Sequence, residues 1–311
     1  MSRATRGFRV SGKFFRAWLH PEIAESGRSM QAPGMKTIET GSTLRAELAK
    51  LPKPLVLVPT MGALHEGHLS LIRRARELAG PTGTVVVSIF VNPIQFDRAS
   101  DLEGYPRPME ADLAVCEAEG VDVVFTPEVS SMYFPDRSIT VLEQSLSQTL
   151  CGATRPGHFD GVCTVVLKLF LLSGCEIAVF GEKDYQQLAI IRRMVRDLNV
   201  PVEIVGGPTV READGLAMSS RNVKLTAEQR ADAPRIRKAL LKASEALTKE
   251  EILQIASEEI SASPLTRIDY LSLVDAETLQ PVDDLNRPTV LATAVFYGDV
   301  RLIDNIQISA R

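Results

Sequence analysis

Residues 55–68 decide the fold, and they read Leu-Val-Leu-Val-Pro-Thr-Met-Gly-Ala-Leu-His-Glu-Gly-His. The first four form a short continuous apolar run, which is typical of a strand buried on both faces. A turn containing glycine follows, and from Leu69 to Ala79 apolar residues recur at helical spacing. The stretch therefore predicts a strand, a turn and a helix that begins at about Leu69.

The same alternation continues as far as residue 208. Apolar runs predict strands at residues 84–91, 121–125, 177–180 and 202–205, and helical spacing predicts helices at 109–119, 162–172 and 186–198. Strands that lack alternation and are separated by helices indicate a parallel sheet covered on both faces. We therefore predict an α/β fold with a Rossmann-like, doubly wound sheet over residues 35–208.

The alternation of single strands and helices ends after residue 208. Thr226 with Gln229, and Thr248 with Glu251, have the spacing of capping boxes that open helices. Strand-like runs follow at residues 267–274 and 289–296. Residues 209–311 are therefore predicted to form a smaller C-terminal α+β domain, which carries the Met-Ser-Ser-Arg stretch of residues 218–221 near its start.

Residues 1–34 differ from the rest of the chain because they are basic and show no sustained period. We predict a disordered N-terminal extension. The stretch has no apolar signal core, and its glutamates and aromatic cluster fit a transit peptide poorly. An upstream start codon, with the ancestral start near Met30 or Met35, is the favoured explanation.

Composition narrows the classes of function. The chain has 311 residues, of which 45% are hydrophobic and 24% charged, as in ordinary globular proteins. Its net charge of −4 lacks the basic excess of a nucleic-acid-binding protein. Four cysteines without a CxxC pair favour a reducing, cytoplasmic setting. The most apolar stretch, residues 162–175, is shorter than the roughly 20 residues of a membrane span, so no membrane association is expected.

His65 and His68 lie where the first strand meets its helix. In a parallel sheet, ligands bind beyond the carboxyl ends of the strands, where a helix N-terminus offers free N–H groups to a phosphate. Two histidines three residues apart can face one anion there, and the anion would favour their charged forms. A chance pair of surface histidines is the plain alternative. A zinc site is disfavoured because the spacing is not that of HExxH.

Residues 59–68 resemble the HxGH signature of the nucleotidylyltransferase superfamily, in the form found in the pantothenate synthetase (pantoate–β-alanine ligase) family. The resemblance covers about residues 36–300, and its other segments have the expected order and spacing: FVNPIQF at 90–96, YPR at 105–107, RPGHFDGV at 155–162, FGEKDYQQL at 180–188 and MSSRN at 218–222.

This resemblance implies an ATP-dependent ligase that condenses (R)-pantoate with β-alanine to give pantothenate, AMP and pyrophosphate through a pantoyl adenylate. It also implies Mg²⁺ with ATP as co-substrate, and a homodimer. Such chemistry needs aligned anions and cations rather than a covalent nucleophile. Two rivals stay open: an adenylyltransferase of the same superfamily that acts on a phosphorylated cofactor precursor, and a nucleotide-binding module without activity.

The resemblance assigns catalysis to His68, as proton donor, and to His65, Lys183 and Arg221. It assigns pantoate to Gln95 and Gln187, with Gln95 also facing β-alanine. Asp112 aligns with an acidic residue near the magnesium, while His158 is expected to shape the pocket. The predicted ATP-binding residues are Met61, Gly62, Ala63, Leu64, His65, Glu66, Gly67, His68, Gly181, Glu182, Lys183, Asp184, Val210, Met218, Ser219, Ser220 and Arg221.

Overall fold

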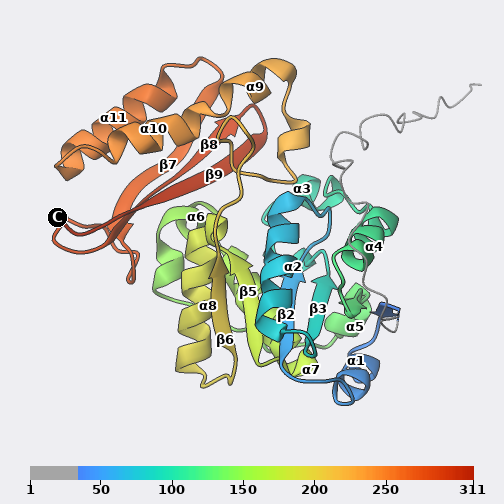
Figure 1. The fold of residues 1–311 in the computed structure, drawn as a ribbon. Coiled ribbons are helices and arrows are strands. Elements are labelled where there is room, and N and C mark those ends of the chain that lie inside the picture. The colour runs from blue at the N-terminus through green and yellow to red at the C-terminus, as the bar shows by residue number, and fades with distance from the viewer. Residues whose placement is uncertain (1–33) are drawn as a thin grey trace, which may run out of the picture. The chain divides into compact units, whose positions relative to one another are not determined.

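The decisive stretch forms strand β2 (Leu55–Thr60) and helix α2 (Glu66–Ala79) in the computed structural model, which describes residues 34–311 (Figure 1). The helix begins three residues before the predicted start at Leu69. The reason is that His65 is its N-cap, and the imidazole of His65 accepts a hydrogen bond from the backbone N–H of Gly67. Sequence spacing located the helix but did not reveal a histidine in a capping position.

The elements follow one another along the chain as two groups. The first group is β1 (Lys36–Ile38), α1 (Gly41–Leu48), β2, α2, β3 (Thr84–Ile89), α3 (Ala99–Glu103), α4 (Met109–Ala118), β4 (Val123–Phe125), α5 (Val129–Met132), α6 (Leu150–Thr154), α7 (His158–Ser173), β5 (Ile177–Gly181), α8 (Tyr185–Asp197) and β6 (Glu203–Gly207). The second is α9 (Ala227–Asp232), α10 (Arg235–Ala243), α11 (Lys249–Ser261), β7 (Thr266–Asp275), β8 (Thr289–Tyr297) and β9 (Val300–Ile308).

The larger sheet has the order β1-β4-β3-β2-β5-β6, and all its pairings are parallel. The chain moves outward from β2 to β3 and β4, and then returns to place β5 on the other side of β2. The order therefore reverses between β2 and β5, and the crevice at their carboxyl ends is where such sheets bind ligands. The predicted doubly wound α/β fold is confirmed.

Successive residues of β2 point to opposite faces of the sheet, which explains its unbroken apolar run. Val56 and Val58 pack in one cluster with residues of α2 and Cys116 of α4. Leu55 and Leu57 pack in the other with residues of α1, α7 and α8. The four residues are at most 1% exposed, so both faces of the strand are covered.

The second sheet is antiparallel, with the order β7-β8-β9, and α10 and α11 lie against it (Figure 1). Both predicted capping boxes are present, at Thr226 with Gln229 and at Thr248 with Glu251. Strand β9 was not predicted. Polar residues interrupt its apolar pattern, and three of them, Arg301, Asp304 and Asn305, line a cleft described below.

Other predicted elements differ mainly at their ends. Helix α7 begins at His158 rather than at residue 162, because Gly157 adopts a left-handed conformation (φ 78°) that turns the chain into the helix. The predicted extension over residues 1–34 lies, apart from Gly34, outside the described residues. The domain boundary proposed at residues 208 and 209 falls just after β6 and stays a prediction. Among residues 34–311, no helix has the length and apolar character needed to cross a membrane.

Candidate active site

A cavity of ≈ 220 Å³ opens at the carboxyl ends of β2 and β5, where the strand order reverses. Three segments that are far apart in the sequence line it. His65 and His68 come from the β2–α2 junction, Lys183 follows β5, and residues 218–221 supply a further part of the lining. The structure thus brings together the four residues predicted to be catalytic.

The loop of residues 60–64 is held in shape by Asp112, which lies in the first turn of α4. The two carboxylate oxygens of Asp112 accept hydrogen bonds from the backbone N–H groups of Ala63 and Leu64, both at 2.8 Å. Gly62 and Ala63 have positive φ angles of 78° and 51°. A side chain on Gly62 would place its Cβ 2.8 Å from an Asp112 oxygen, so glycine is required there.

His65 and His68 cap α2 reciprocally. Nδ1 of His65 accepts from the N–H of Gly67, and Nδ1 of His68 accepts from the N–H of His65. Since both Nδ1 atoms are acceptors, each neutral ring carries its proton on Nε2. The ring centroids lie 4.1 Å apart. The cap thus leaves each ring with an Nε2–H donor that the backbone does not use.

Burial is the main reason why both imidazoles stay neutral. It lowers the pKa of His65 to about 2, with additional contributions from His68 and Lys183. It lowers the pKa of His68 to about 4, and the charge of Lys183 acts in the same direction. At neutral pH the two imidazoles are therefore neutral N–H donors, and the side chain of Lys183 lines the same cavity.

Lys183 lies in a short 3-10 turn, residues Glu182–Asp184, that follows β5. Its Nζ is 3.9 Å from a carboxylate oxygen of Asp184. The side-chain amide of Asn305 on β9 donates to the backbone oxygens of Glu182 and Lys183, at 3.1 and 3.0 Å. The antiparallel sheet therefore holds the turn that presents the lysine, a contact that sequence patterns did not predict.

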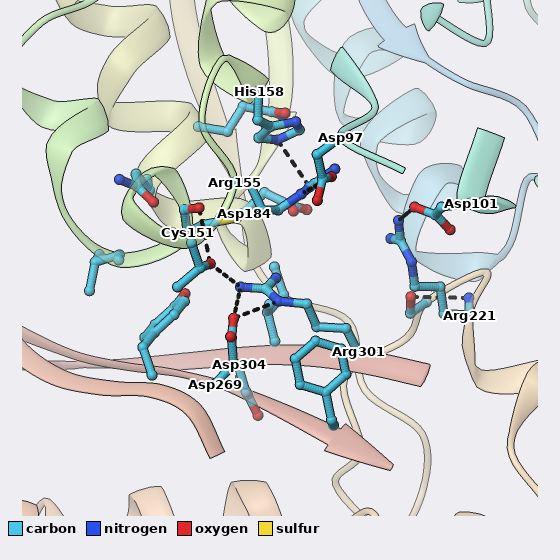
Figure 2. A pocket seen from close by; sticks show the side chains of 18 of the residues that line it. Asp97, Asp101, Cys151, Arg155, His158, Asp184, Arg221, Asp269, Arg301 and Asp304 are labelled. Atoms are coloured by element: carbon cyan, nitrogen blue, oxygen red, sulfur yellow. Dashed lines mark hydrogen bonds and ion pairs between the residues drawn. The ribbon is translucent and has the colours of Figure 1, made fainter. Parts of the chain in front are cut away.

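Arg221 is held differently. Its guanidinium Nη2 lies 3.1 Å from a carboxylate oxygen of Asp101 on α3, and Figure 2 shows the two side chains turned toward each other. The backbone of the same loop is tied to residue 210, because Met218 N–H donates to the oxygen of Val210 at 3.0 Å. The charge of Arg221 is thus partnered by the carboxylate of Asp101.

A second cavity of ≈ 630 Å³ adjoins the first and shares Lys183, Gln187 and Arg221 with it. Arg155 and Asp97 form an ion pair of 2.8 Å in its wall (Figure 2). Arg301 of β9 pairs with Asp269 of β7 at 2.8 Å in the same cavity. This space lies between the parallel sheet and the antiparallel sheet.

The two predicted pantoate residues both reach the smaller cavity. Gln95 is 9% exposed and points its side-chain nitrogen at the sulfur of Met61, 3.2 Å away. His158 holds the backbone of Gln95, with 2.7 Å between its Nδ1 and the oxygen of Gln95. Burial lowers the pKa of His158 to about 4, which leaves it neutral. These contacts place His158 against Gln95, and its pocket-shaping role stays a prediction.

Most of the predicted ATP-binding residues line the smaller cavity, and a few do not. Gly62, Ala63 and Leu64 form the loop behind it, whereas Glu66 forms an ion pair with Arg73 on the surface. Glu182 contributes its backbone oxygen to Asn305. These five positions do not line the cavity, and their binding of ATP stays a prediction.

Asp112 was predicted to ligate magnesium. It is 3% exposed, and each of its carboxylate oxygens already accepts a backbone N–H. Burial raises its pKa, and the two amide bonds act in the opposite direction. The geometry gives Asp112 the role of organising the loop and does not fit a direct metal ligand.

A doubly wound sheet whose reversal point carries HxGH histidines, a lysine and an arginine defines an enzyme of the nucleotidylyltransferase superfamily. Comparisons with known proteins narrow this class. The family model described as pantoate-beta-alanine ligase matches residues 35–307.

Among curated relatives, the pantothenate synthetase of Akkermansia muciniphila is 56% identical over an alignment of 281 residues, which covers 88% of this chain and 100% of the relative. That of Thermosipho melanesiensis is 51% identical and covers 88% of this chain and 98% of its own length.

Solved structures agree with this result. Pantothenate synthetase from Thermus thermophilus matches with a TM-score of 0.82 at 47% identity, over 88% of this chain and 99% of the other. Pantoate-beta-alanine ligase from Francisella tularensis, solved in complex with beta-gamma ATP and beta-alanine, matches with a TM-score of 0.74 at 33% identity, over 88% and 97%. The chain belongs to the pantoate–β-alanine ligase family, and it is an enzyme of that kind.

Proposed function

We propose that this ligase activates (R)-pantoate as pantoyl adenylate in the ≈ 220 Å³ cavity and transfers the acyl group to β-alanine. A pantoate carboxylate oxygen attacks the α-phosphate of ATP, and pyrophosphate leaves. The amine of β-alanine then attacks the acyl carbon, AMP leaves with the bonding electron pair, and the nitrogen loses a proton to give pantothenate.

One observation carries this proposal: two neutral Nε2–H donors, an ammonium and a guanidinium line one cavity at the reversal point of the sheet. Such groups stabilise negative charge that develops on phosphate oxygens, and they need no covalent intermediate with the protein. Because the donors are fixed by the cap of α2, little reorganisation accompanies the reaction.

The residues of the cavity take separate roles. His65 and His68 donate hydrogen bonds to phosphate oxygens through Nε2–H, and His68, the predicted proton donor, acts through this hydrogen bond as charge develops. Lys183 compensates phosphate charge from the β5 side. Arg221 leaves Asp101 and binds phosphate when ATP enters, since a triphosphate carries more charge than one carboxylate.

The substrates other than ATP are assigned to the remaining polar groups. Gln95 and Gln187 bind pantoate, and Gln95 also faces β-alanine. β-Alanine reaches the acyl adenylate through the larger cavity, which the residues around Arg155 and Arg301 line. Exclusion of water from this space protects the reactive intermediate.

Three further features belong to the proposal. Mg²⁺ binds with ATP through its phosphates, as it does in many enzymes that supply few protein ligands. The working enzyme is a homodimer, as the family resemblance implies. Its location is the cytoplasm, which the cysteine spacing favours.

Pyrophosphate exchange into ATP tests the proposal. We expect exchange that requires pantoate, and release of AMP that requires β-alanine in addition. Exchange that proceeds without pantoate would favour an adenylyltransferase with a different acceptor, and absence of exchange under every condition would favour a binding module.

A further inference from the structure

Gln95 is the last residue in a chain of side-chain hydrogen bonds that begins at Tyr133. The hydroxyl of Tyr133 lies 2.8 Å from Oδ1 of Asn92. Nδ2 of Asn92 donates to Oε1 of Gln95 at 2.8 Å and to the backbone oxygen of Gly161 at 3.1 Å. Asn92 is 1% exposed, so water does not compete for these contacts.

The direction of these hydrogen bonds is set by the backbone oxygen of Gly161. The backbone oxygen of Gly161 can only accept, so the atom of Asn92 that faces it must be the amide nitrogen. The amide oxygen of Asn92 then faces Tyr133 and accepts its O–H. The second hydrogen of Asn92 Nδ2 requires an acceptor, which is the side-chain oxygen of Gln95.

This arrangement determines what Gln95 offers to a substrate. Because its oxygen is taken by Asn92, its Nε2 points the other way, toward Met61, and both residues belong to the lining of the ≈ 220 Å³ cavity. We propose that Tyr133 and Asn92 are positioning residues that set the amide of Gln95 so that it presents only N–H donors to pantoate. The proposal rests on the assignment of Gln95 to pantoate made above.

Close packing keeps the chain of hydrogen bonds in register. A Cβ on Gly161 would lie 2.5 Å from the backbone oxygen of Ile94 and 2.7 Å from Cα of Gln95, so α7 lies directly against the segment that carries Gln95. The ring of Tyr133 is contacted by the cations of Arg137 and Lys168, at 5.4 and 6.0 Å from its centroid. Burial raises the pKa of Tyr133, so its hydroxyl keeps the proton that it donates.

The substrate atom that meets Gln95 must therefore be an acceptor, such as a carboxylate or hydroxyl oxygen of pantoate. A freely rotating glutamine amide can bind either a donor or an acceptor of the substrate. A fixed amide that presents N–H groups disfavours a substrate donor next to Gln95. Tyr133 and Asn92 thus contribute to substrate selection without contact with the substrate.

Tyr133→Phe tests the proposal, because it removes only the hydroxyl. We expect the KM for pantoate to rise about fivefold, the effect of one net hydrogen bond, while the KM for ATP stays the same. Asn92→Asp is the second variant. A carboxylate only accepts, so Gln95 must turn its amide and direct its oxygen at the substrate, and the KM for pantoate should rise by at least about tenfold.

A double-mutant cycle separates positioning from general structure. In a Gln95→Ala background, Tyr133→Phe should leave the KM for pantoate where Gln95→Ala alone puts it. The matched control is Tyr297→Phe, which removes another tyrosine hydroxyl, 2.9 Å from a carboxylate oxygen of Asp232, and should leave the KM for pantoate unchanged.

Three outcomes overturn the proposal. If Tyr133→Phe and Asn92→Asp both leave the KM for pantoate unchanged while Gln95→Ala raises it, Tyr133 and Asn92 do not position Gln95, and the assignment of Gln95 to pantoate stands. Equal fold-changes for Tyr133→Phe in the two backgrounds would show that it does not act through Gln95. If Gln95→Ala has no effect on the KM for pantoate, Gln95 does not bind pantoate, and the positioning role of Tyr133 and Asn92 fails as well.

Discussion

The two walls of the small cavity are built in opposite ways. On the β2–α2 side, the donors are fixed by local hydrogen bonds: Asp112 holds the loop, and the histidines cap the helix that carries them. On the other side, Arg221 is held by an ion pair with Asp101 on a five-residue helix. In Asp101 and Arg221, 27% and 31% of the side-chain surface is exposed.

This difference shows where the protein is preorganised and where it exchanges partners. Buried donors on a backbone scaffold keep their geometry when no ligand is present, and they suit charge that develops during the reaction. A partly exposed ion pair contributes little to stability and is easily replaced by a stronger anion. The first wall is therefore expected to govern the rate of adenylation, and the second the binding of ATP.

The largest effects are expected for His68 on the fixed side and for Lys183, whose turn is held by Asn305. His68→Ala or Lys183→Ala should lower pantoate-dependent pyrophosphate exchange at least about 10²-fold, the usual effect of one preorganised donor. Lys242→Ala is a suitable control, because Lys242 pairs with Glu259 on the surface, and exchange should stay at the wild-type rate. Full exchange activity in His68→Ala would contradict the assignment of His68 as proton donor.

Asp112→Ala tests whether the loop depends on this carboxylate. Two buried N–H groups lose their acceptor, so the free energy of unfolding should fall by about 1–3 kcal/mol, and exchange should fall with it. Chemical denaturation measures the first effect. The Mg²⁺ concentration needed for half-maximal exchange should not change, and a large increase would show that Asp112 ligates the metal after all.

The neutral histidines predict how stability depends on pH. Their pKa values in the folded protein, about 2 for His65 and about 4 for His68 and His158, lie below the ordinary value near 6.5. The unfolded chain therefore binds more protons than the folded protein below pH 6.5, and the free energy of unfolding falls as the pH drops from 6.5 toward 4.

Denaturation curves between about pH 7 and pH 5 measure this slope before most carboxylates titrate. In a His68→Gln variant the slope should be smaller by up to about one proton. An unchanged slope would indicate that His68 is already charged in the folded protein, which would undermine the donor geometry described for the cap.

The smallest effect is expected on the side where Asp101 holds Arg221. Asp101→Asn removes the competitor of ATP for Arg221, so the KM for ATP should fall by no more than about fivefold, with little change in the maximal rate. The difference in the KM for ATP between the wild-type protein and Asp101→Asn should become smaller at high salt, because salt screens the ion pair in the wild-type protein. An increase in the KM for ATP would instead mean that Asp101 positions Arg221 for the nucleotide.

Much of the fold was predictable because it depends on local patterns. The apolar run of residues 55–58 and the helical spacing that follows it indicated a buried parallel strand and its helix. Capping boxes at Thr226 and Thr248 located helices correctly. Strand β9 was missed because Arg301 and Asn305 stand where the strand faces the cleft rather than the core, and because Asp304 is buried in an ion pair with Arg211.

The site was predictable only in part, for a related reason. Motifs identified His65, His68, Lys183 and Arg221, since their residue types and order are local properties. Contacts between distant segments have no such signal. Asp101, Asn92, Tyr133 and Asn305 were not predicted, and the role proposed for Asp112 changed, because each acts through a partner that lies elsewhere in the chain.

The sequence by itself thus determined the alternation of strands and helices, the family and the chemical groups of the site. The tertiary structure alone decided how these groups are set: neutral histidines with their protons on Nε2, an arginine held by Asp101, and a glutamine amide of one polarity. The physical reason is that protonation and hydrogen-bond direction depend on burial and on neighbours in space.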